Sequence, residues 1–142
     1  MKKIISTAFI IVLALLCFSS CEEDRGALNE LPLSELKATD IASFKLTINP
    51  PNYEGTFDGK EEIAELVGLL KDLVIYDRDN PLIDYYGQWV QFDLTFADGG
   101  VNTVAAFASQ ITIGEIAYKA EYAPCEALNA FANRVAGTSF AK

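Results

Sequence analysis

Apolar and polar residues alternate in several segments of the chain, with the period of two that is typical of half-buried β-strands. The clearest case is residues 90–96, where Val90, Phe92 and Leu94 would share one face. Asp98-Gly99-Gly100 follows this segment and predicts a hairpin turn, because glycine tolerates positive φ angles. The pattern as a whole predicts five strands, at residues 41–49, 90–96, 101–108, 111–113 and 116–120.

Two other segments repeat apolar residues at the spacing of an amphipathic helix. The first covers residues 60–74, and we expect Asp58 to cap it with Glu61 completing a capping box. The second begins near Pro124, and Gly137 is expected to end it. The order β-α-β-β-β-β-α favours an α+β fold, with a four- to five-stranded antiparallel sheet and two helices packed on one face.

The other face of this sheet is expected to stay open to solvent or to a partner. Exposed tyrosine and tryptophan can stack on sugar rings or anchor a protein interface, although a loop or helix could instead cover Trp89 as part of a small core cluster. In strand 101–108 both phases are apolar, and we expect Phe107 to point inward because a large aromatic side chain gains most from burial. The predicted binding surface consists of Tyr85, Tyr86, Trp89, Gln91 and Asp93.

The first residues have the layout of a secretory signal peptide: Lys2 and Lys3 precede an apolar run at residues 8–18. This run is shorter than the roughly 20 apolar residues of a membrane-spanning helix. The following residues, Phe18-Ser19-Ser20-Cys21, resemble the lipobox of bacterial lipoproteins, with Phe18 in place of the usual leucine. The resemblance implies cleavage between Ser20 and Cys21 and a lipid on the Cys21 thiol.

Such a lipid would anchor the protein to the cell membrane or the outer membrane, facing outside the cytoplasm. We therefore expect residues 1–20 to be a signal peptide and residues 21–40 to be the lipidated cysteine with an acidic tether. The folded domain would cover residues 41–137, and residues 138–142 would fray. The part after the tether resembles small extracytoplasmic domains of bacterial lipoproteins, through the capped helix Asp58–Leu73, the Asp98-Gly99 turn, and a late strand with Gly114 and Tyr118.

Composition narrows the possible functions of the 142-residue chain. Its net charge of −9 argues against binding of nucleic acid, which requires a basic surface. It contains no histidine, which excludes Ser-His-Asp and Cys-His catalysis and histidine-ligated zinc. Of three cysteines, Cys17 would be removed and Cys21 lipidated, so Cys125 has no partner for an intrachain disulfide. We expect Cys125 to be buried on the last helix.

The only metal hypothesis concerns carboxylates in the polar segment 76–87. Asp77, Asp79 and Asp84 could supply oxygen ligands to calcium. An EF-hand loop is excluded, because Leu82 stands where glycine is needed and Gln88 where glutamate is needed. A solvated acidic loop is the simpler interpretation, and we predict no cofactor.

These observations favour a non-catalytic binding or interaction module, tethered to the membrane through Cys21, with an unknown protein or glycan partner. One alternative is a structural spacer lipoprotein of the cell envelope. The other is a hydrolase, which would need two carboxylates about 5–10 Å apart across a concave site.

Overall fold

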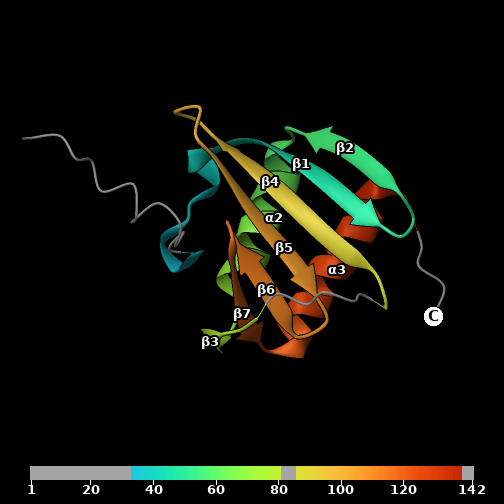
Figure 1. The fold of residues 1–142 in the computed structure, drawn as a ribbon. Helices are drawn as coiled ribbons and strands as arrows, with labels where there is room; N and C mark the ends of the chain where they lie inside the picture. Colours follow the sequence, from blue (N-terminus) through green and yellow to red (C-terminus); the bar gives the residue numbers. More distant parts are fainter. Residues whose placement is uncertain (1–32, 81–85, 139–142) are drawn as a thin grey trace, which may run out of the picture.

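Seven antiparallel strands form one sheet in the computed structural model, which describes residues 33–80 and 86–138 (Figure 1). The strands lie in the order β2-β1-β4-β5-β6-β7-β3, so β2 and β3 form the two edges. Successive antiparallel pairs join β4 through β7. The bounds are β1 (Ile41–Asn49), β2 (Tyr53–Phe57), β3 (Ile75–Arg78), β4 (Trp89–Phe96), β5 (Val101–Phe107), β6 (Gln110–Ile113) and β7 (Ile116–Ala120).

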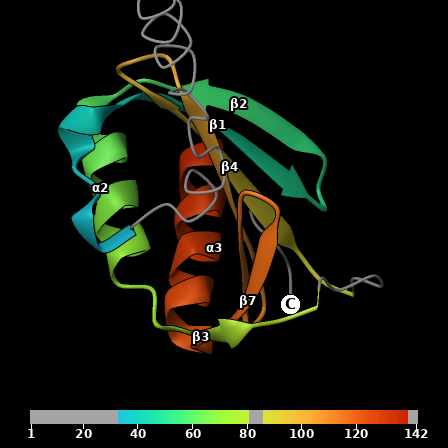
Figure 2. The same cartoon turned by 60° about the vertical axis from the view of Figure 1, so that its left-hand side comes forward.

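Two helices, α2 (Lys60–Lys71) and α3 (Tyr122–Ala136), lie side by side on one face of the sheet (Figures 1 and 2). The core fills the space between them and the strands. The Phe131 ring of α3 lies 6.1 Å from that of Phe44 and 6.0 Å from that of Phe92, measured between centroids. Within the described residues, no helix is long and apolar enough to cross a membrane. The predicted α+β class, with one antiparallel sheet and two helices, is confirmed.

The predicted number of strands is wrong, because the sheet has seven strands rather than four or five. All five predicted strands are present, and the two additional ones are the edges β2 and β3. β1 ends at Asn49, directly before Pro50-Pro51, and the chain then returns beside it as β2, with Tyr53 opposite Ile48. β3 lies in the segment that we expected to be a loop. Edge strands pair on one side only and carry more polar side chains, so their alternation is weak.

The predicted phase of β5 is also wrong. Val104 pairs with Phe92 and is fully buried in the core, whereas Phe107 lies on the opposite, open face and is half-buried. The register follows from the β4–β5 turn, where the Phe96 N–H donates to the Gly100 carbonyl at 2.7 Å and Gly99 has a φ of 90°. Hairpin register decides which side chains face inward, even when the other phase contains the larger residue.

The helix ends differ in how well they were predicted. Gly59, not Asp58, is the N-cap of α2, and no side chain caps that end. Asp58 therefore does not form the expected capping box with Glu61. Gly137 does end α3, in the left-handed conformation with a φ of 65°, as expected.

The packed core begins before residue 41. Leu33 and Leu36 are only 7% and 4% exposed, and both belong to the core. They lie in and beside the first of two short 3₁₀ turns, Leu33–Glu35 and Ala38–Asp40, which contact α2. The expected tether therefore includes residues that pack against the domain. Cys21, Ser20 and the signal peptide lie outside the described residues.

Candidate functional site

Trp89, Gln91 and Asp93 lie on the open face of β4, opposite the buried Val90, Phe92 and Leu94. The middle of this face is a hydrogen-bonded polar surface. Gln91 Nε2 and Thr103 Oγ1 both donate to Asp93 Oδ1, at 2.7 and 2.8 Å. That carboxylate oxygen is therefore already engaged by its neighbours.

Trp89 lies near one end of the open face and is half-buried. It lines a hollow of about 390 Å³ together with Asn49, Pro50 and Gly87. Tyr85 lies outside the described residues. Tyr86, which is 96% exposed, lines a different and larger groove that Trp89 does not line. Tyr86 and Trp89 thus line different hollows, and Gly87 lines both.

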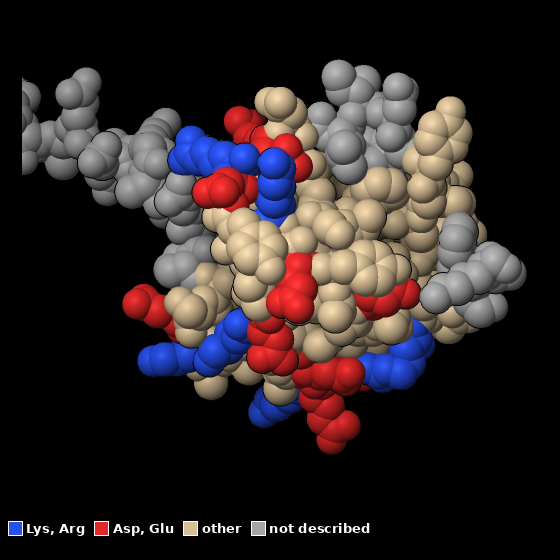
Figure 3. Space-filling model, turned by 90° about the horizontal axis from the view of Figure 1, so that it is seen from below, with Lys and Arg blue, Asp and Glu red and all other residues tan. Residues whose placement is uncertain are grey.

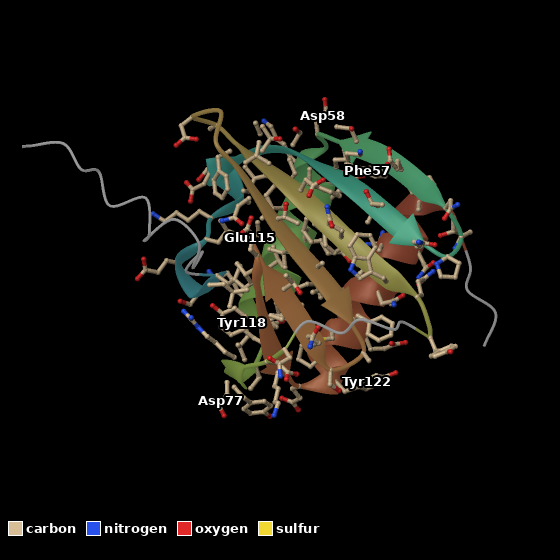
Figure 4. The ribbon with its side chains drawn as sticks, in the orientation of Figure 1. Phe57, Asp58, Asp77, Glu115, Tyr118 and Tyr122 are labelled. Atoms are coloured by element: carbon tan, nitrogen blue, oxygen red, sulfur yellow. The ribbon has the colours of Figure 1, made fainter. Side chains whose placement is uncertain are left out.

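The larger groove has a volume of about 510 Å³, which lies within the usual range of ~300–1,000 Å³ for small-molecule sites. Three parts of the chain form it: the residues before β4, the turn between β5 and β6, and one face of α3. It runs beside Tyr122, which is labelled at the lower right of the domain in Figure 4. The residues that matter for its chemistry are Tyr86, Gln88, Phe107, Tyr122, Glu126, Asn129 and Asn133.

The α3 wall of the groove is a polar stripe that the sequence-based predictions did not include. Tyr122, Glu126, Asn129 and Asn133 follow one another at intervals of four, three and four residues. This spacing places them on one helical face. The signal was present in the sequence, although the prediction for this helix used only its apolar face.

The first turn of this wall holds an aromatic ring in place. Tyr122 Oη donates to Glu126 Oε2 at 3.2 Å, and the tyrosine is 53% exposed. Because the hydroxyl is engaged by Glu126, the ring face is the part of Tyr122 that is offered to a ligand. Glu126 is itself half-buried and retains a second carboxylate oxygen.

A network of carboxamides forms the base of the groove. Gln88 is 6% exposed and its Nε2 donates to the Pro50 carbonyl at 2.9 Å and to Asn133 Oδ1 at 3.1 Å. Asn133 Nδ2 donates to Gln88 Oε1 and, at 2.8 Å, to Asn129 Oδ1. Thr138 Oγ1 donates to Asn133 Oδ1 at 3.0 Å. These bonds satisfy the buried Gln88 amide and fix the orientation of the half-buried Asn133 amide.

Asn129 is the end of this network that faces the groove. Its Oδ1 accepts the hydrogen bond from Asn133 Nδ2, and the residue lines the groove. No acceptor among the described residues bonds to Asn129 Nδ2. The groove is therefore lined by an amide whose two N–H donors are unpaired within the described residues, about two helical turns along α3 from Tyr122.

The opposite wall is built from backbone and the ring of Phe107. A Cβ atom on Gly87 would lie 3.4 Å from Phe107 Cε2, and Gly87 has a φ of 142°, which side chains rarely adopt. Ala108, in the adjacent turn, has a φ of 49° although it is not glycine. Ala108 is strained in this conformation, and strained residues cluster at functional sites.

The cation that lines the groove is already engaged. Arg134 forms a salt bridge to Glu65 at 2.6 Å, and its guanidinium lies 5.4 Å from the centre of the Phe131 ring. Figure 3 views the domain from below, with acidic side chains across the middle and lower part of this face and basic ones at the upper left and around the lower margin. The groove therefore combines polar, aromatic and acidic groups, and its arginine is held by other partners.

The calcium hypothesis gains no support from the two aspartates that can be described. Asp79 Oδ1 accepts a hydrogen bond from the Asn80 N–H at 2.9 Å, and its Oδ2 accepts one from Gln110 Nε2 at 3.2 Å. Asp77 is exposed and lies at the lower left in Figure 4, across the domain from Tyr122. Asp84 lies outside the described residues. Residues 33–80 and 86–138 contain no cluster of three or more potential metal ligands from histidine, cysteine, aspartate or glutamate.

Cys125 lies on the core side of α3 and is 2% exposed. Burial raises the pKa of its thiol to about 11. The thiol is therefore protonated at neutral pH, and a protonated thiol is a poor nucleophile. This agrees with the expectation that Cys125 is a packing residue.

Comparisons of the chain with known protein families, with curated proteins and with solved structures give no match. The functional proposal therefore rests on the groove and on the N-terminal sequence.

Proposed function

We propose that this protein is a lipid-anchored binding module, held outside the cytoplasm by an acyl group on Cys21. The lipobox-like sequence Phe18-Ser19-Ser20-Cys21 supports the anchor. The module is non-catalytic and presents its groove to a ligand in the cell envelope or beyond it.

The observation that carries the binding role is the groove on α3. It combines an oriented ring, Tyr122, with an oriented amide, Asn129, and both are available to a ligand. Pockets that combine apolar surface with a few fixed polar groups are the usual form of small-molecule sites. A spacer needs no such arrangement, because it makes no specific contact through this surface.

The anchor is tested by labelling cells with a radioactive or clickable fatty acid. The wild-type chain should take up the label, and its mature N-terminus should be residue 21 by mass spectrometry. Cys21→Ser should lose both the label and cleavage at this position. A labelled Cys21→Ser protein, or a mature chain that begins elsewhere, would contradict the anchor.

Binding is tested by capture from envelope extract with the wild-type protein and two tyrosine variants. Tyr122→Ala removes the aromatic ring from the groove. Tyr76→Ala is the matched control, because Tyr76 is an exposed tyrosine (62% exposed) on the edge strand β3, outside the groove. Material that is retained by wild type and Tyr76→Ala but lost with Tyr122→Ala supports binding through the groove. Identical retention by all three proteins contradicts it.

A further inference from the structure

Resting on the binding role proposed above, we infer that the α3 groove takes a neutral carbohydrate. Tyr122 and Tyr86 would contact the C–H faces of the sugar, Asn129 would donate to its hydroxyl oxygens, and Glu126 would accept from its hydroxyl groups. The inference depends on the combination of these groups in one groove, since none of them alone identifies a ligand.

The aromatic groups suit a sugar ring better than an aliphatic ligand. Tyr122 is 53% exposed and Tyr86 is 96% exposed, both line the groove, and the Tyr122 hydroxyl donates to Glu126. The face of an aromatic ring carries partial negative charge, and it attracts the weakly positive C–H groups on one face of a pyranose. A purely aliphatic ligand would cover Asn129 Nδ2 without offering it an acceptor, which is costly.

The polar groups match the hydroxyls of a sugar. Each sugar hydroxyl can both donate and accept a hydrogen bond. A protein site that offers one donor and one acceptor can therefore bond to two neighbouring hydroxyls. Asn129 Nδ2 supplies donors, and the second oxygen of Glu126 supplies an acceptor, one helical turn away. Side chains three residues apart on a helix have Cβ atoms about 5–6 Å apart, which allows both to reach one sugar ring.

The charges of the groove argue for a neutral ligand. Arg134 is engaged by Glu65 and Phe131, and Glu126 adds negative charge beside Asn129. The whole chain carries a net charge of −9. An anionic sugar would therefore meet repulsion in the groove without a compensating cation.

The position of the groove argues against an extended peptide. A peptide usually gains its main-chain hydrogen bonds by pairing with the edge of a sheet. The edges here are β2 and β3, whereas the strand residues that line the groove come from the end of β5. Binding must then rely on side chains, as it does for a sugar.

The test uses the full chain in a detergent that lacks a sugar headgroup. The probes are neutral gluco-, xylo-, manno-, galacto- and N-acetylglucosamine oligosaccharides, with oligogalacturonate as the charged comparison. Binding is measured by isothermal titration calorimetry, because Trp89 does not line the groove and its fluorescence is no direct report of occupancy. We expect at least one neutral oligosaccharide to bind, and oligogalacturonate to bind at least about tenfold more weakly.

Three variants locate the bound sugar. Tyr122→Ala and Asn129→Asp should each weaken binding about tenfold or more, while Tyr76→Ala should leave it unchanged. Asn129→Asp is the sharper change, because the carboxylate can still accept from Asn133 but has no N–H to offer the ligand. Thermal melting of each variant checks that the fold persists, and chemical-shift changes in α3 on titration provide a second measure of the site.

The inference is overturned if no neutral oligosaccharide binds, or if binding persists unchanged in both groove variants. Its failure can be separated from that of the proposed function. If capture from envelope extract depends on Tyr122 while every neutral sugar fails, the ligand class is wrong and the binding role stands. If neither capture nor sugar binding depends on Tyr122, both proposals fall.

Discussion

Leu36→Ala tests where the folded domain begins, and therefore how long the tether is. Leu36 is 4% exposed and belongs to the core beside α2. Truncating a buried leucine to alanine costs about 2–5 kcal/mol, because transfer energy is lost and a cavity remains. Leu36 lies at the margin of the core, where neighbouring residues can move inward. We therefore expect a loss near the lower limit, about 2–3 kcal/mol.

The assay is urea unfolding followed by the fluorescence of Trp89, supported by thermal melting. For a domain of this size, a loss of 2–3 kcal/mol lowers the melting temperature by roughly 8–20 °C. Glu35→Ala is the matched control, because Glu35 is an exposed neighbour and its removal should change stability by less than about 0.5 kcal/mol. If Leu36→Ala is as stable as this control, residues 33–40 belong to the tether and not to the core.

The result sets the maximal distance between the folded domain and the membrane. At roughly 3.3 Å per extended residue, a tether of residues 22–40 could span about 60 Å, whereas one of residues 22–32 could span about 36 Å. The groove would then operate closer to the lipid surface than the sequence alone indicates.

Three further predictions concern the core and the groove. Trp89→Ala should lower the free energy of unfolding, measured by urea titration, by about 1–2 kcal/mol. This is less than the roughly 3–5 kcal/mol expected for a fully buried tryptophan, because Trp89 is half-buried. A loss above about 3 kcal/mol would contradict its placement. Gly87→Ala should lower the free energy of unfolding by about 1–3 kcal/mol, because alanine is strained at the φ of 142° that Gly87 adopts. A variant as stable as the wild type would refute that conformation. Burial raises the pKa of the Cys125 thiol from 9.0 to about 11, so the folded state holds this proton more tightly than the unfolded state. The free energy of unfolding relative to Cys125→Ala should therefore be constant below pH 9 and fall by up to roughly 1.4 kcal/mol per pH unit between pH 9 and 11. A pH-independent difference would contradict the burial.

Local patterns were sufficient for the parts of the fold that depend on near neighbours in the chain. The alternation of Val90, Phe92 and Leu94 predicted the buried face of β4 correctly, and these residues are fully buried. The Asp98-Gly99-Gly100 turn and the Gly137 helix stop were predicted correctly too. In each case the cause is the side-chain period of a strand or the permitted φ of glycine, and neither depends on a distant residue.

The missed elements depend on what lies across the fold. β2 and β3 are edge strands, whose pairing on a single side leaves little trace in the hydrophobic pattern. The burial of Leu33 and Leu36 depends on α2, which begins well after them in sequence. The phase of β5 was wrong for the same reason, because pairing with β4 outweighed the burial gain of Phe107.

The groove shows the same division between sequence and structure. The stripe from Tyr122 to Asn133 is visible in the sequence, since helical spacing alone places its members on one face of α3. Its partner Gln88 is 45 residues away from Asn133, and only the packing of α3 against the sheet brings their amides together. The sequence by itself thus determined which groups α3 could present. The tertiary structure decided that Asn129 accepts from Asn133 through its Oδ1 and keeps its Nδ2 unpaired among the described residues, because packing of α3 against the sheet fixes Asn133 against the buried Gln88.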